Sequence, residues 1–271
     1  MLFHDLRQLH GRYAHVYLSP HMDDVSLSCG GAIAGQRAAG EAVLVVTICT
    51  AAPPATGPFS TLAEEFHREW GLSAAEAVAA RLREDQDSMA VLDVDSLLVG
   101  MLDALYRQPA VYDRRETLFG TPAAGDPLVL ALRDVFAGLR ERLPVARFYA
   151  PLGVGSHVDH LITYQAAAEC WGPTQVLYED FPYVVREGEL DRRLAQVGGD
   201  LRPVTVAIAP HLQRKLRAIC AYTSQIDELA HSQLGHQVSG DEAIAVMRAT
   251  ASAYMHQVGG ERFWERGLLP G

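Results

Sequence analysis

The alternation of short apolar runs with longer amphipathic segments predicts an α/β fold whose strands are mostly parallel. Apolar runs with the length of buried strands occupy residues 14–18, 43–48, 146–149, 175–178 and 204–209. Helical spacing of apolar residues occupies 24–39, 73–92, 127–143, 156–171, 211–222 and 241–254. Because these elements alternate, the carboxyl ends of the strands should share one edge of the sheet, which is where ligands bind in such folds.

Chain length and composition predict one globular domain that spans residues 1–271. Hydrophobic residues make up 49% of the chain, and no linker rich in Pro, Gly and Ser divides it. No apolar run approaches the roughly 18 residues that a membrane span needs, and the first residues lack a basic-then-apolar signal pattern. We therefore expect a soluble, cytoplasmic protein with no membrane partner.

The charge of the chain argues against nucleic acid as a partner. The formal net charge is −10, and Lys and Arg form no block that could follow a phosphate backbone. The cysteines at 29, 49, 170 and 220 form no C-x-x-C pair, so neither a zinc knuckle nor a disulfide framework is indicated. We expect reduced thiols that are buried as small apolar residues.

The segment after the first apolar run carries the strongest candidate site. His21, Asp23 and Asp24 follow Pro20, which cannot continue a strand, and they stand where a helix begins. His21 and Asp24 are three residues apart and can converge, whereas Asp23 must point elsewhere. We therefore assign His21 and Asp24 as ligands of a divalent metal and leave Asp23 free as a base. The alternative is a helix N-cap cluster, because Asp favours the first turn of a helix.

A second cluster, formed by His157, Asp159 and His160, follows the apolar run at 146–149. Catalytic zinc usually has three protein ligands of N or O type plus a water, so the site needs a ligand from another strand end. If a helix begins near Ser156, His157 and His160 lie one turn apart on the same face. Either histidine could complete the metal site.

The two motifs, His-x-Asp-Asp and His-x-Asp-His, together resemble the PIG-L/LmbE-like family of zinc-dependent N-acetylglucosaminyl-conjugate deacetylases. The resemblance covers the chain from residue 14 to about residue 225. It implies a Rossmann-like fold with helices on both faces of the sheet. It also implies His21, Asp24 and His160 as the zinc ligands, with Asp23 as the general base that acts on zinc-activated water.

The same resemblance implies further roles in catalysis and substrate binding. His157, as an imidazolium, would face the oxyanion formed during amide cleavage, and Asp159 would orient it. Arg81, in an Arg-x-x-Glu helix, would contact the sugar conjugate, and Asp103 would bind sugar hydroxyls. Without the resemblance, Arg81 and Glu84 are a surface ion pair of little energetic weight, and Asp103 is a cap or turn residue.

The chain departs from the family pattern at three positions near the motifs. Met22 stands where Pro is common, Val25 stands where Glu is common, and Gly155 stands where some relatives have a tyrosine that polarises the substrate carbonyl. The zinc ligands are untouched, but the source of oxyanion stabilisation is left open. Residues 222–225 resemble a late family motif whose role does not follow from the sequence.

Two other regions carry weaker expectations. Residues 105–126 show no clear period, and loops of this length are often functional, so we expect this segment to border the pocket. Glu179 and Asp180 follow the strand at 175–178, and turn residues are the favoured interpretation over a further acid pair.

These observations lead to the hypothesis of a hydrolase that removes an N-acetyl group from an N-acetylglucosamine-type sugar conjugate, a small-molecule partner. One rival is a metallohydrolase that cleaves a different amide or a phosphoester. Another is a metal-containing carbohydrate-binding protein without turnover. Ligands of N and O type accommodate Fe or Co as well as Zn. The aglycone is left open, as is assembly into a homo-oligomer.

Overall fold

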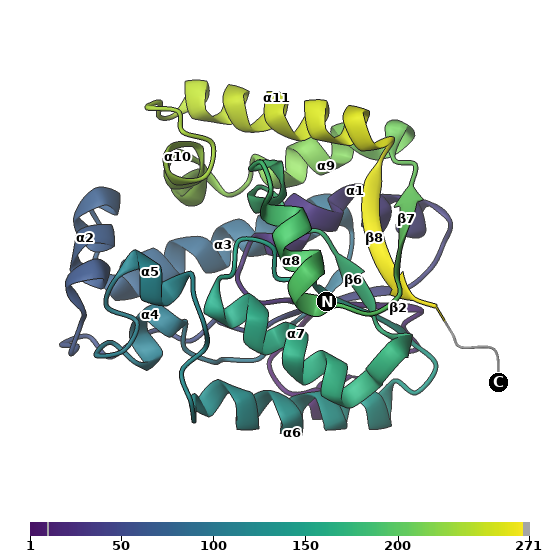
Figure 1. The fold of residues 1–271 in the computed structure, drawn as a ribbon, viewed down its shortest axis with the longest axis horizontal. Coiled ribbons are helices and arrows are strands. Elements are labelled where there is room, and N and C mark those ends of the chain that lie inside the picture. Colours follow the sequence, from purple (N-terminus) through teal and green to yellow (C-terminus); the bar gives the residue numbers. More distant parts are fainter. Residues whose placement is uncertain (10, 268–271) are drawn as a thin grey trace.

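A sheet of eight strands forms the centre of the computed structural model, which describes residues 1–9 and 11–267 (Figure 1). The strand order is β1-β4-β3-β2-β5-β6-β8-β7. Pairs from β1 to β6 are parallel, and β8 runs antiparallel to both β6 and β7. The strands are β1 (Leu2–Phe3), β2 (His15–Ser19), β3 (Val43–Thr47), β4 (Asp95–Leu98), β5 (Arg147–Pro151), β6 (Val176–Tyr178), β7 (Leu201–Val206) and β8 (Glu261–Arg266).

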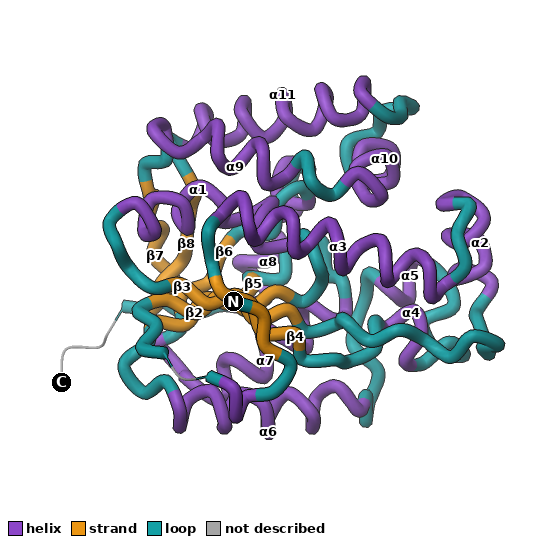
Figure 2. Tube along the Cα trace, turned by 180° about the vertical axis from the view of Figure 1, so that it is seen from behind, coloured by secondary structure: helices purple, strands orange, loops and turns teal. Residues whose placement is uncertain are grey.

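Helices cover both faces of the sheet (Figures 1 and 2). Helices α6 and α7 lie on one face, α1, α3 and α9 lie on the other, and α11 forms an outer layer with α10. Helices α2, α4 and α5 gather at one end of the molecule (Figure 1). The helices are α1 (Asp24–Ala38), α2 (Thr61–Trp70), α3 (Ala74–Leu92), α4 (Ala104–Arg107), α5 (Arg115–Leu118), α6 (Pro127–Arg142), α7 (Val158–Trp171), α8 (Glu189–Val197), α9 (Leu212–Ile219), α10 (Thr223–Ser232) and α11 (Asp241–Val258).

The central strands are buried on both faces, which explains their continuous apolar sequence. Successive side chains of a strand point to opposite faces. In β2, Val16 and Leu18 belong to the same core cluster as Phe136 of α6, whereas Tyr17 belongs to the cluster that contains Ile33 of α1. The sheet is therefore packed between two layers of helices, and polar groups lie at its edges.

The predicted α/β fold, with a mostly parallel sheet and helices on both faces, is confirmed. The last predicted strand is misplaced, because β7 ends at Val206 and residues 209–211 form a 3-10 turn that contains Pro210. Strand β8 was not predicted, because four of its six residues are charged. Both strands lie at the antiparallel end of the sheet, where β7 is largely exposed and an apolar run is not required. Within residues 1–9 and 11–267, no helix has the length and apolar character needed to cross a membrane.

The strand order reverses between β2 and β5. From β2 the chain continues to β3 and then β4 on one side, and it returns to place β5 and β6 on the other side. At such a switch point the connections leave in opposite directions and open a crevice at the carboxyl ends of the strands.

Candidate metal centre and active site

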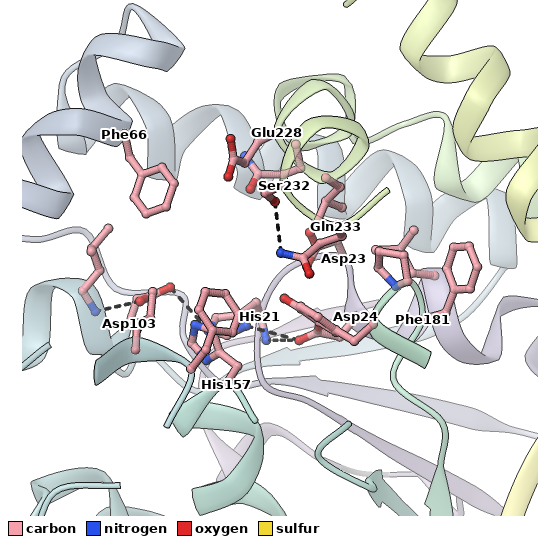
Figure 3. Close-up of a pocket in the computed structure, with 18 of the residues that line it drawn as sticks. His21, Asp23, Asp24, Phe66, Asp103, His157, Phe181, Glu228, Ser232 and Gln233 are labelled. Atoms are coloured by element: carbon pink, nitrogen blue, oxygen red, sulfur yellow. Dashed lines mark hydrogen bonds and ion pairs between the residues drawn. The ribbon is translucent and has the colours of Figure 1, made fainter. Parts of the chain in front are cut away.

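The predicted site residues meet in the crevice beyond the carboxyl ends of β2 and β5. His21 lies two residues after β2, and Asp24 is the first residue of α1. His157 is the N-cap of α7, and His160 lies in the first turn of that helix. All four side chains are buried, and Figure 3 shows His21, Asp24 and His157 side by side.

The two imidazole rings of His21 and His160 and the carboxylate of Asp24 surround one point. His21 Nδ1 lies 3.3 Å from His160 Nε2 and 3.4 Å from Asp24 Oδ2. His160 Nε2 lies 3.3 Å from Asp24 Oδ1. With metal–ligand bonds of roughly 2.0–2.1 Å, neighbouring ligands of a tetrahedral zinc are about 3.3–3.4 Å apart. The two contacts of Asp24 go to different oxygens of its carboxylate, and the three side chains together bring N and O donors of the kind that bind divalent ions close to one another. This donor set supports a metal cofactor at the site.

Other groupings of ligand-type side chains share His21. Their ligand atoms lie within 4.8 Å of one another in two sets, His21 with His157 and His160, and His21 with Cys49 and Asp159. Asp24 belongs to neither set, although its carboxylate contacts both imidazoles, through Oδ2 at 3.4 Å to His21 and through Oδ1 at 3.3 Å to His160.

Asp159 supports His21 from the other side of the imidazole ring. Its Oδ2 lies 3.1 Å from His21 Nε2 and accepts a hydrogen bond from the backbone N–H of Ala104 at 2.9 Å. Its Oδ1 accepts a hydrogen bond from Arg107 Nη2 at 2.6 Å. A carboxylate behind a metal-binding imidazole commonly fixes the tautomer and the ring orientation. Arg107 is in turn held by Asp126 through contacts of 2.7 and 2.9 Å.

This arrangement corrects the expected role of Asp159. The carboxylate was predicted to orient His157, but it is occupied by His21 and Arg107. Only the backbone N–H of Asp159 contacts His157, by donating to Nδ1 at 3.2 Å. Since Nδ1 accepts this bond, the ring proton of a neutral His157 sits on Nε2.

The charge state of His157 depends on its buried surroundings. Burial and the neighbouring His21 hold the pKa of His157 well below its ordinary value, although Asp159 opposes this shift. This direction favours the neutral imidazole over the imidazolium that the family resemblance implies. The neutral ring can still donate one hydrogen bond from Nε2.

Asp180 holds the second imidazole of the cluster, a role that the sequence interpretation missed. Its Oδ1 lies 2.7 Å from His160 Nδ1. Its Oδ2 accepts hydrogen bonds from the backbone N–H groups of Gly153 and Val154 at 2.7 and 2.8 Å. Treating Asp180 as a turn residue was wrong, and the available signal was its place two residues beyond β6 at the same sheet edge.

Glu179, the neighbour of Asp180, serves the fold. Its Oε1 accepts hydrogen bonds from Arg262 Nε at 2.5 Å and from Trp264 Nε1 at 2.8 Å, and both partners belong to β8. The adjacent acids therefore face different parts of the molecule, one toward the site and one toward the antiparallel strands.

Asp23 stays free of the imidazole contacts that occupy Asp24. The Nη2 atom of Arg81 lies 3.7 Å from Asp23 Oδ1, and both side chains line the pocket. Burial raises the pKa of Asp23 to about 7, against the opposing charge of Arg81. This carboxylate can therefore both accept and release a proton near neutral pH.

The surrounding carboxylates give the cluster a strongly cation-attracting character. Burial opposes a charge on His21, yet Asp103, Asp159 and Asp24 hold its pKa well above the ordinary value. Asp24 and Asp180 likewise raise the pKa of His160 to about 9 despite burial. Protons on the imidazoles and a divalent cation are alternative ways of balancing this negative charge.

The two softer predictions, Arg81 and Asp103, both line the pocket. Asp103 Oδ2 lies 3.4 Å from His21 Nε2, and its Oδ1 accepts a hydrogen bond from the N–H of Leu105 at 2.9 Å. Asp103 is therefore a helix cap and a site residue at once. Glu84 is not paired with Arg81; it accepts hydrogen bonds from the backbone N–H and the hydroxyl of Ser224 at 2.8 and 2.6 Å.

The contacts of Glu84 give the 222–225 segment a structural role. Glu84 belongs to α3 and binds the first turn of α10, so it fixes this helix above the metal cluster. Figure 3 shows Glu228 and Ser232 of α10, and Gln233 directly after this helix, on the opposite side of the pocket from His21 and Asp103.

The pocket above the cluster opens to solvent. Its lining combines the metal cluster with apolar groups from four parts of the chain, among them Phe66, Leu105, Phe119 and Phe181. Leu105 and Phe119 confirm that the segment 105–126 borders the pocket, although this segment includes the short helices α4 and α5. A polar floor with apolar walls suits a substrate whose reacting group is polar.

The chain is similar to known deacetylases over most of its length. The 2'-N-acetylparomamine deacetylase of Streptomyces fradiae is 30% identical over 230 residues, which cover 82% of this chain and 77% of that protein. The enzyme of the same name from Niallia circulans is 28% identical over 197 residues, covering 65% and 70%. The crystal structure of the zinc-inhibited form of teicoplanin deacetylase has a TM-score of 0.72 at 25% identity and covers 92% of this chain and 96% of its own.

Fold, site and relatives together define an enzyme of the N-deacetylase class with a metal-binding site. Residues 16–171, more than half of the chain, match the PIG-L family, which is described as GlcNAc-PI de-N-acetylase. The chain belongs to the PIG-L family. This stretch includes both predicted motifs and ends with α7, so the matched region is the part of the sheet that builds the metal cluster.

Proposed function

We propose that this protein uses zinc to hydrolyse the N-acetyl group of a small amino-sugar conjugate. The observation that carries the proposal is the close approach of the His21 and His160 imidazoles and the Asp24 carboxylate, with contacts of 3.3–3.4 Å, and the Asp23 carboxylate in the same pocket. When bound, the metal supplies Lewis-acid chemistry, which makes water more acidic and an amide carbonyl more electrophilic. All other steps fall to side chains of the chain itself.

Asp23 is the proposed general base and acid. It takes a proton from water as the water oxygen forms a bond to the acyl carbon. It then delivers that proton to the nitrogen as the C–N bond breaks, so the products are acetate and a free amine. Arg81 lies 3.7 Å from Asp23 and is positioned to hold both this carboxylate and the sugar.

His157 is proposed to stabilise the negative charge that develops on the acyl oxygen. Its neutral ring carries a proton on Nε2, because Nδ1 accepts the N–H of Asp159. A fixed donor of this kind needs no reorganisation during the reaction. Asp159 and Arg107 are positioning residues, since they act through His21.

The substrate class is inferred from the relatives and from the pocket. The curated relatives are named for 2'-N-acetylparomamine and a solved relative is named for teicoplanin, so we propose an N-acetylated amino-sugar conjugate for this chain as well. Asp103, at the pocket wall next to His21, is the proposed acceptor for sugar hydroxyls. The apolar walls leave room for an aglycone beyond the sugar.

The test is acetate release from a panel of N-acetylated amino sugars and their conjugates, with a phosphate ester as the rival substrate. Metal-free protein should be inactive, and activity should return on adding zinc; iron and cobalt are added in parallel to identify the metal that supports the highest turnover. Release of phosphate without acetate would support another metallohydrolase. Tight binding of an acetylated sugar by zinc-loaded protein, with no acetate formed, would support a carbohydrate-binding protein instead.

A further inference from the structure

Tyr183 is a buried tyrosine that faces the reacting end of the pocket. It opens the 3-10 turn Tyr183–Val185 beyond β6, and it is 8% exposed. Its ring lies edge-on to His160, with ring centroids 5.8 Å apart, and 6.1 Å from the ring of Phe119. It lines the same cavity as Asp23 and His157.

The hydroxyl of Tyr183 differs from those of other buried tyrosines. Tyr178 donates its O–H to the carbonyl of Leu18 at 2.8 Å, and Tyr222 donates to Asp85 at 2.8 Å. Among the residues that the structure describes, none hydrogen-bonds to the Tyr183 hydroxyl. The hydroxyl oxygen is also absent from the buried side-chain atoms that lack a partner, so it is accessible from the cavity that Tyr183 lines. An accessible phenol without a protein partner is free to donate its O–H to a molecule that enters the cavity.

Gly155 is the residue that gives the Tyr183 ring its space. A Cβ at position 155 would lie 2.6 Å from both Cγ and Cδ1 of Tyr183, and the backbone there has a φ of +86°. A side chain at 155 and the Tyr183 ring therefore exclude each other. The missing side chain at 155 thus lets the Tyr183 ring, from the loop after β6, occupy this part of the cavity wall.

We propose that Tyr183 is a catalytic residue that donates its phenolic O–H to the acyl oxygen of the substrate. This inference rests on the proposed function. Tyrosine has an ordinary pKa of about 10, so the donor is protonated at neutral pH. As the water oxygen bonds to the acyl carbon, negative charge grows on the acyl oxygen, and Tyr183 and His157 approach it from two loops. The loss of one such donor typically lowers kcat by about 10²–10³-fold.

The direct test is the variant Tyr183→Phe, which removes one oxygen and keeps the ring over Gly155. We expect kcat for acetate release to fall by about 100-fold with KM changed by less than about threefold, because the bond strengthens mainly in the transition state. Zinc content and thermal midpoint should match those of the parent. The matched control is Tyr178→Phe, which deletes a phenol that serves the fold and should lower the thermal midpoint while kcat stays within about twofold.

A binding measurement separates this proposal from the proposed function. Acetate, the expected product, carries its charge on the oxygen that Tyr183 would contact. Loss of one hydrogen bond should weaken acetate binding to zinc-loaded protein by about 3–10-fold in Tyr183→Phe, with no change in Tyr178→Phe. If the parent releases no acetate from any substrate but Tyr183→Phe still weakens acetate binding, the proposed function fails and the role of Tyr183 as donor stands. Unchanged acetate affinity, or a kcat within threefold of the parent, would overturn it.

Discussion

Two buried polar clusters contact α1, and they use charge in different ways. In the first, Lys215 of α9 pairs with Glu261 of β8 at 2.7 Å and also donates to the carbonyl of Leu27 at 2.6 Å. Glu261 accepts the N–H groups of Gly31 and Ala32 at 2.8 and 2.6 Å. Each carboxylate oxygen has a donor, and the positive and negative charges match, so this cluster closes on itself.

The metal cluster has the opposite character. Asp159 and Asp180 hold the outer nitrogens of His21 and His160, while the inner nitrogens and Asp24 turn their lone pairs toward one another. Such an arrangement is stable only when protons or a cation occupy its centre. Buried charge alone therefore does not mark a functional site. A functional site is marked by a buried cluster in which the donors and acceptors are not all paired with one another.

The largest expected effect comes from Asp23→Asn, which keeps shape and removes the base. We expect kcat to fall by about 10²–10⁴-fold, while zinc content stays at the parent value because Asp23 is not among the proposed ligands. Acetate release in initial-rate assays and metal analysis of the same preparation check this. Loss of zinc together with activity would show that Asp23 binds the metal instead.

Lys215→Met should break the closed cluster and leave Glu261 buried without its partner. The free energy of unfolding in urea should fall by about 3–5 kcal/mol. The turnover of the folded enzyme should stay within about twofold of the parent.

The matched control for this prediction is the double variant Lys215→Met with Glu261→Met, which removes both charges. It should recover part of the loss, because no charge is then left buried without a partner. A double variant less stable than Lys215→Met would contradict the charge argument.

Asp85 sharpens the comparison because it is a buried carboxylate whose hydrogen bonds come from the hydroxyls of Tyr222 and Thr47. Burial raises its pKa from the ordinary 3.8 to about 6. The folded state thus holds this proton more tightly than the unfolded state, so this group stabilises the fold below pH 4 and loses that contribution as pH rises to 6. The difference corresponds to about 3 kcal/mol.

The variant Asp85→Asn should therefore gain stability relative to the parent as pH rises from 4 to 7, by about 3 kcal/mol over the interval. Urea unfolding of both proteins at several pH values measures this gain. Two stability profiles that stay parallel across the interval would mean that Asp85 titrates normally.

The smallest of the four effects is expected for Asp180→Asn, which weakens the support of His160. Outer partners of metal-binding imidazoles typically contribute about 10–100-fold to metal affinity. Competition with a chromogenic zinc chelator should show a loss in that range, and excess zinc should restore most of the activity. An unchanged zinc affinity would mean that Asp180 serves only the loop at Gly153.

The parts of the site that could be predicted are those whose functional residues stand close together in the sequence. His21, Asp23 and Asp24 stand together at the end of an apolar strand, and the strand-helix alternation places His157 and His160 at the same edge. Their assembly follows from parallel topology, since all carboxyl ends of parallel strands share one edge.

The parts that could not be predicted depend on contacts between distant segments. Arg107 reaches Asp159 across 52 positions, and no local pattern marks an arginine that will be buried. Tyr183 faces the pocket because of the course of its loop, and β8 joins the sheet through backbone pairing despite its charged sequence. Such contacts are set by tertiary packing and carry no periodicity of their own.

The central claim is that His21, Asp24 and His160 hold one catalytic metal ion, and its most direct test is zinc binding by alanine variants. Calorimetric titration of metal-free protein should give one high-affinity zinc per chain for the parent and for His157→Ala. Asp24→Ala and His160→Ala should each lose that binding. Retention of high-affinity zinc by Asp24→Ala, together with its loss in His157→Ala, would contradict the account and assign the third ligand to His157.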